Sequence, residues 1–152
     1  MRRVLVSVLV AGLLAWPAVG VAPAKSGKGT MCVLHARLSA KNETTGSTST
    51  ATGHAQIKVW NDGTISYKAQ IFNPNHETFV AGHIHQAPVG VAGPIVVPLF
   101  AGPATSNSHI KLGGVVTPLA GTTGANLCQN PGAYYVNFHT TTFPAGAIRG
   151  QL

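Results

Sequence analysis

The sequence predicts an all-β domain, an antiparallel Greek-key-like sandwich or barrel of seven to eight short strands. Three observations support this fold class. Short segments alternate apolar and polar residues with the period of a strand, and Gly, Pro, Asn and Ser separate them. No stretch has the apolar period of a long amphipathic helix. A chain of 152 residues suits one domain with one modest core.

The N-terminal segment is typical of an export signal. Arg2 and Arg3 precede an apolar run that ends near Trp16, and small residues follow up to Ala24. The apolar run is too short to span a bilayer. We therefore expect a signal peptide over 1–24 and one domain over 25–152. The protein is then secreted or periplasmic, without a transmembrane segment in the mature chain.

The first expected strands cover 32–40 and 54–60, and the Ser/Thr/Gly-rich stretch between them is predicted to be a flexible loop. Asp62-Gly63 is a hairpin turn signal, so a third strand over 65–72 should pair with the second. The fourth strand is expected over 79–86. A Gly/Pro-rich turn separates it from an apolar strand over 95–100.

The second half of the chain predicts one more strand over 109–116, a turn of helix near 125–129, and two last strands over 134–140 and 147–152. If the last two strands pair, alternation places Asn137, His139, Arg149 and Gln151 in one polar patch. Such a patch is typical of the solvated face of an antiparallel sheet.

Three histidines are the candidate metal ligands. His83 and His85 lie one residue apart in a predicted strand, so both side chains point to the same face. His139, on another predicted strand, would complete a nitrogen-rich site suited to copper or zinc. In the alternative interpretation, the His83 and His85 rings hydrogen-bond to the backbone or to Asn137 and hold the turn at 90–94. Metal affinity should fall below about pH 6, because protonated imidazoles do not bind metal.

The remaining histidines are expected to face solvent, with His54 kept as a reserve ligand. They are His35, His54, His76 and His109. Asn42 begins the sequence Asn42-Glu43-Thr44, which fits a glycosylation site in a source that glycosylates secreted proteins.

Acidic residues are scarce, and their number excludes several chemistries. The chain has three, namely Glu43, Asp62 and Glu77. Asp62 belongs to a turn and Glu43 to the predicted flexible loop, so we do not expect them to share a cleft. A two-carboxylate glycosidase is therefore disfavoured, and so is a calcium site or a carboxylate-rich magnesium site.

The two cysteines, Cys32 and Cys128, predict one disulfide, because an exported protein meets an oxidising environment. Ten Lys and Arg residues against three acids give a net charge of +7. This excess should attract anionic surfaces, polysaccharides or small anions. The basic residues form no run along the sequence, so nucleic-acid binding is not expected.

Four motifs together resemble the CHRD domain, a family named for repeats in chordin that also occurs as single secreted domains in microbes. The resemblance covers roughly 34–152. It implies an all-β fold, export, and a binding or structural role toward an unknown extracellular ligand or protein. Ala92 and Ala147 replace the Asn and Glu usual in the family, and the second change removes a carboxylate near the histidines. The motifs are Ala81-Gly82-His83-Ile84-His85, Gly93-Pro94-Ile95-Val96-Val97, Tyr135-Val136-Asn137-Phe138-His139-Thr140 and Pro144-Ala145-Gly146-Ala147-Ile148-Arg149-Gly150-Gln151-Leu152.

A weaker similarity is to the Cu/Zn superoxide dismutases. In that comparison His83, His85 and His139 hold copper, and Arg149 attracts the anionic substrate. No acid follows His85 at the place of the dismutase zinc site, so the site would hold copper alone. Three hypotheses follow: a CHRD binding or structural module without catalysis, which we favour, a copper-binding protein, and a copper-dependent oxidoreductase.

Overall fold

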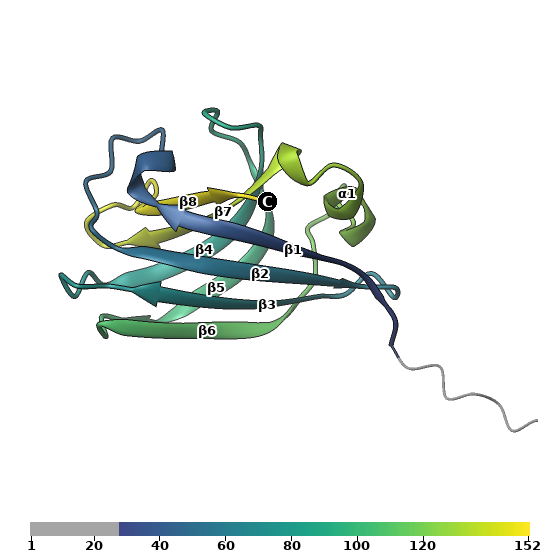
Figure 1. The fold of residues 1–152 in the computed structure, drawn as a ribbon, viewed down its shortest axis with the longest axis horizontal. Coiled ribbons are helices and arrows are strands. Elements are labelled where there is room, and N and C mark those ends of the chain that lie inside the picture. The colour runs from purple at the N-terminus through teal and green to yellow at the C-terminus, as the bar shows by residue number, and fades with distance from the viewer. Residues whose placement is uncertain (1–27) are drawn as a thin grey trace, which may run out of the picture.

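The computed structural model describes residues 28–152, so the expected signal peptide over 1–24 lies outside the described residues (Figure 1). Eight antiparallel strands form one sheet, which confirms the all-β prediction. Within 28–152, no helix is long and apolar enough to cross a membrane. The strands are β1 (Thr30–Ser39), β2 (Thr52–Trp60), β3 (Ile65–Phe72), β4 (Phe79–Gln86), β5 (Ile95–Thr105), β6 (His109–Val116), β7 (Tyr134–Thr140) and β8 (Ile148–Gln151).

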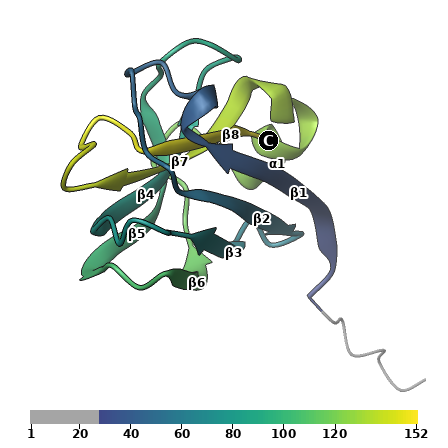
Figure 2. The same cartoon turned by 60° about the vertical axis from the view of Figure 1, so that its left-hand side comes forward.

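The sheet is curled and nearly closed. Its strand order is β5-β4-β7-β8-β1-β2-β3-β6. The two edge strands, β5 and β6, contact each other, so the sheet wraps around its own core in a barrel-like arrangement (Figures 1 and 2). Each strand therefore has one face toward the core and one toward the outside.

The inward residues of the strands fill the core. Ile57, Ile65, Ile84 and Phe138 are fully buried, and they come from four different strands. Tyr67 also points inward from β3, whereas Trp60 lies on the outer side, where its Nε1–H donates a hydrogen bond to Ser66 Oγ. The alternation read from the sequence therefore assigns the two faces of β2 and β3 correctly.

Gly82 lets the ring of Phe138 pack against the backbone of β4. An ideal Cβ at Gly82 would meet the Phe138 ring atoms Cε1 and Cδ1 directly. We expect Gly82→Ala to lower the free energy of unfolding by about 1–3 kcal/mol, the usual range for overpacking a core. Urea-induced unfolding measures this loss. Gly132→Ala is the control, because open space surrounds that position. Equal stability of the two variants would contradict this packing.

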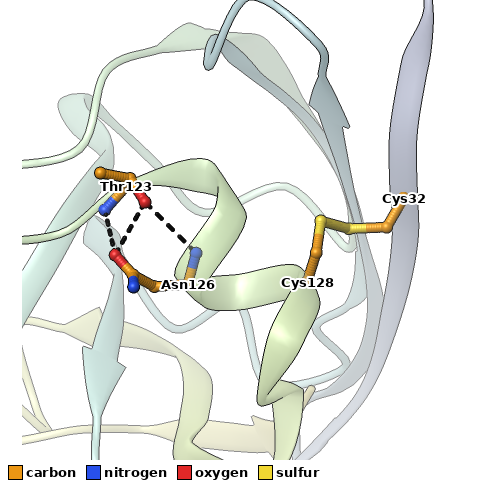
Figure 3. The surroundings of a disulfide bond; sticks show 4 residues. All are labelled: Cys32, Thr123, Asn126 and Cys128. Carbon is orange, nitrogen blue, oxygen red and sulfur yellow. Dashed lines mark hydrogen bonds between the residues drawn. A yellow bond between two sulfur atoms is a disulfide. The ribbon is translucent and has the colours of Figure 1, made fainter.

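A disulfide joins β1 to the short helix α1 (Gly124–Gln129), as Figure 3 shows. Cys32 and Cys128 are 96 residues apart in sequence, and their Cα atoms lie 5.9 Å apart. Thr123 and Asn126 cap the helix, since the Asn126 N–H donates to Thr123 Oγ1 and the Thr123 N–H donates to Asn126 Oδ1. Both the predicted disulfide and the predicted turn of helix are confirmed. Two 3-10 turns, η1 (Ala40–Asn42) and η2 (Pro131–Ala133), complete the regular structure.

Candidate metal centre

The three candidate histidines lie together on the outer face of β4 and β7. His83 pairs with Asn137 across the two strands, and His139 pairs with Ala81, two residues before His83. Alternation along β4 places His85 on the same face. One nitrogen from each of the three rings lies within 4.8 Å of the others. The structure therefore brings together histidines that are 56 residues apart in sequence.

Backbone carbonyls orient two of the three rings. His85 Nδ1 donates to the Gly93 carbonyl at 2.9 Å, and His139 Nδ1 donates to the Pro144 carbonyl at 3.0 Å. Each neutral ring carries one N–H, so Nε2 of both rings keeps a free lone pair. Within 28–152, the buried Nε2 of His85 has no hydrogen-bond partner. Metal-ligating histidines are commonly held by such a contact at the other ring nitrogen.

His83 supplies the third nitrogen. Its Nδ1 lies 3.1 Å from Nε2 of His139. Because His139 Nε2 is an acceptor in this tautomer, His83 Nδ1 donates its proton to it in the metal-free protein. His83 is half-buried, whereas His85 and His139 are 8% and 9% exposed. The alternative interpretation is partly correct, since the His85 ring does hydrogen-bond to the turn at Gly93, but the His83 ring hydrogen-bonds to His139 and not to the Asn137 side chain.

The surroundings keep the three imidazoles neutral. Burial, with repulsion from His139 and His85, lowers the pKa of His83 to about 4. Burial likewise lowers the pKa of His85 and of His139, although a backbone carbonyl opposes the shift in each ring. A neutral imidazole is the form that binds metal. Protons should therefore compete with the metal for these nitrogens only at a pH lower than the value of about 6 that the sequence predicts.

The lowered pKa of His83 predicts a pH dependence of folding in the metal-free protein. The pKa of the ring is 6.5 in the unfolded chain, whereas in the folded protein it is about 4. Stability should therefore fall as the pH drops through this interval. Urea unfolding of metal-free protein at several pH values measures the slope. His83→Gln should reduce this dependence of stability on pH. The control His35→Gln replaces an exposed histidine and should leave it unchanged. Equal slopes in His83→Gln and the unmutated protein would contradict the assignment.

The polar patch beside the histidines is covered, so the expectation of a solvated face is wrong. Arg149 is 2% exposed, and its guanidinium lies 3.3 Å from the centre of the Tyr135 ring. Arg149 Nη1 donates to the Val91 carbonyl and Nη2 to the Pro88 carbonyl. Gln151 Nε2 donates to the Ala87 carbonyl. These side chains hold the loop between β4 and β5 over the outer face of the sheet.

A second loop, between β1 and β2, covers the same part of the outer face. Figure 2 shows both loops rising on the side of β7 and β8. Thr45 Oγ1 donates to the Gly146 carbonyl and Ser47 Oγ to the Ala147 carbonyl. The stretch predicted to be flexible is thus fixed by hydrogen bonds. Asn42 Nδ2 donates to the carbonyls of Arg37 and Arg149, and a glycan on that nitrogen would remove at least one of these bonds.

Glu43 reaches the patch on this loop, which the sequence did not predict. Both of its carboxylate oxygens lie 2.9 Å from the place that a Cβ of Gly146 would take, and Asn137 Nδ2 lies 2.7 Å from it. Burial raises the pKa of Glu43 to about 7, although Arg149 opposes the shift. In the described part of the chain, Glu43 Oε1 and Asn137 Oδ1 are buried without partners. A carboxylate is therefore present in the patch, although residue 147 is alanine.

The remaining histidines are all exposed, as expected, and lie outside the cluster. They are His35 on β1, His54 on β2, His76 after β3 and His109 on β6. His54 pairs across the sheet with Arg37 and Gln70, so the reserve candidate does not join the three-histidine cluster.

The curled antiparallel sheet, its disulfide and its loop-covered outer face define an all-β domain suited to an oxidising compartment. The family model of the CHRD domain matches residues 34–152, and the chain belongs to this family. The resemblance inferred from the motifs is confirmed. CHRD domains are in general extracellular binding or structural modules. Neither a curated protein nor a solved structure matches the chain.

Proposed function

We propose that this CHRD domain is a secreted or periplasmic binding module that holds one transition-metal ion between His83, His85 and His139. The observation that carries the proposal is the buried, unpartnered Nε2 of His85, which belongs to a group of three ring nitrogens within 4.8 Å of one another. A buried polar atom without a partner is costly unless a ligand or water satisfies it. A metal ion would satisfy all three lone pairs at once.

The spacing between two of the three ring nitrogens fits a common ion. Two nitrogens bound to one tetrahedral ion lie roughly 3.3 Å apart, given metal–nitrogen bonds of about 2.0–2.1 Å. His83 Nδ1 and His139 Nε2 are 3.1 Å apart. The ion would replace the proton that these atoms share, and His83 would carry its proton on Nε2 instead. The Gly93 and Pro144 carbonyls already hold the other two rings in the tautomer that metal binding needs.

Copper is the ion that this donor set favours. Imidazole ligands suit copper and zinc, and divalent copper binds a given nitrogen site more tightly than zinc. Three neutral histidines supply no charge, and the neighbouring carboxyl of Glu43 has its pKa raised to about 7 by burial. Harder ions that prefer several carboxylates are disfavoured by the same donor set.

Metal binding without catalysis is favoured over dismutase chemistry, because Arg149, which would have to guide the anionic substrate to the copper, is bound to other groups of the protein. Arg149 is buried, lies against Tyr135, and donates to the carbonyls of Val91 and Pro88. Its charge is therefore directed into the loop between β4 and β5. We infer that the domain stores or delivers the metal, or that the metal stabilises the domain. We expect copper-loaded protein to show no superoxide dismutation above a free-copper control.

Titration of the metal-free domain with Cu(II) and Zn(II) tests the proposal. We expect one equivalent of either ion to bind, copper to displace zinc, and the bound ion to raise the melting temperature by mass action. The matched control is His54→Ala, which removes an exposed histidine outside the cluster. Two results would refute the proposal. One is that neither ion binds, and the other is that His54→Ala weakens binding as much as His83→Ala does.

A further inference from the structure

The outer face of β1, β2, β3 and β6 is exposed and basic. The inward residues of these strands build the core, so alternation sends Arg37, Lys58, Lys68 and Lys111 to the outside. The four strands contain no Asp or Glu. All three acids of the chain lie in loops, so every charged side chain on these four strands is positive.

Strand pairing aligns these residues into rows. Arg37 pairs with His54, His54 with Gln70, and Gln70 with Lys111, which makes one row across all four strands. Gln56 pairs with Lys68 in the neighbouring row. Adjacent strands are about 4.8 Å apart, so the first row is roughly 14 Å long. Residues that are scattered in the sequence thus form one polar strip, with a cation at each end of the first row and Lys68 in the second.

Two adjoining hollows cross this strip. The larger, of about 390 Å³, is lined in part by Arg37, Phe72, His109 and Lys111. The smaller, of about 280 Å³, is lined by residues that include Lys68, and the two hollows share His54 and Gln70. Phe72 is 49% exposed, and its ring centre lies 5.3 Å from that of His109. The hollows therefore combine cations, amide groups and a flat apolar ring.

We propose that this face binds a linear acidic polysaccharide. The cations complement the regularly spaced acidic groups of such a chain, the amide of Gln70 can exchange hydrogen bonds with its hydroxyls, and the Phe72 ring offers a surface for the flat side of a sugar. CHRD domains are in general extracellular, where acidic polysaccharides are abundant. This location favours a polysaccharide over a nucleic acid. The strip shares no residue with the three-histidine cluster, so this proposal does not depend on the proposed metal site.

Affinity electrophoresis of the metal-free protein in gels that contain polygalacturonate, a linear polyuronate, tests the proposal. Lys111→Glu should weaken binding by roughly five- to tenfold, because one exposed ion pair is lost and a repulsion is added. Lys41→Glu changes the net charge equally, but Lys41 lies in η1 outside the strip, and we expect less than about a twofold effect. Lys68→Gln gives a second, milder probe of the strip, and circular dichroism verifies folding of each variant.

Several outcomes would overturn this assignment. One is the absence of binding to polygalacturonate at physiological ionic strength, and another is an equal loss of affinity in Lys111→Glu and Lys41→Glu. Tighter binding to double-stranded DNA, or to vesicles of anionic phospholipid, than to polygalacturonate would assign the strip to a different class of partner.

Discussion

His139→Ala is expected to lower the Cu(II) affinity of the domain at about pH 7 by a hundredfold or more, since the loss of a metal ligand should exceed the 10–100-fold effect of losing a group that only hydrogen-bonds to a ligand. His139 Nε2 lies next to His83 Nδ1, and its own ring is fixed by the Pro144 carbonyl. The variant would leave two rings to hold the ion. Competition with a chromogenic copper chelator measures the change.

Because every residue of β7 is buried, His139→Ala could also destabilise the fold. His83→Ala separates the two effects, since His83 is only half-buried and its removal should reduce the affinity by a similar factor. Thermal unfolding of the metal-free variants verifies that they are folded. Copper affinity unchanged in both variants would contradict the proposed ligand set.

Removal of the disulfide by Cys32→Ser with Cys128→Ser should lower the free energy of unfolding by about 3–5 kcal/mol in the chain-entropy model. The two residues are 96 apart in sequence, so the link constrains most of the unfolded domain. Denaturant-induced unfolding measures the loss.

The same double variant should bind copper as before in the folded state, because the disulfide joins β1 to α1, whereas the histidines lie on β4 and β7. A stability change below about 1 kcal/mol would contradict the expected role of the link. Loss of copper affinity in folded protein would show instead that α1 supports the metal centre.

Much of the fold could be predicted because its signals are local. Alternation marks which side of each strand is apolar, and the Asp62-Gly63 turn fixes the hairpin of β2 and β3. The shared face of His83 and His85 follows from the same period of two. The expected strand over 95–100 was too short, because β5 continues to Thr105 through a Gly/Pro-containing segment that normally indicates a loop.

Features that depend on distant contacts could not be predicted. Nothing near Glu43 in the sequence indicates that its loop lies over Gly146, which only the absence of a side chain at residue 146 permits. The burial of Arg149 depends on carbonyls at Pro88 and Val91. The row from Arg37 to Lys111 likewise exists only once four strands are in register.

The most direct test of the metal centre is a crystal structure of the copper-loaded domain with anomalous scattering at the copper edge. We expect one strong peak at roughly 2.0–2.2 Å from His83 Nδ1, His85 Nε2 and His139 Nε2, with the Gly93 and Pro144 carbonyls still accepting hydrogen bonds from the other nitrogens of His85 and His139. A peak at His54 or another exposed histidine, with none between these three rings, would contradict it.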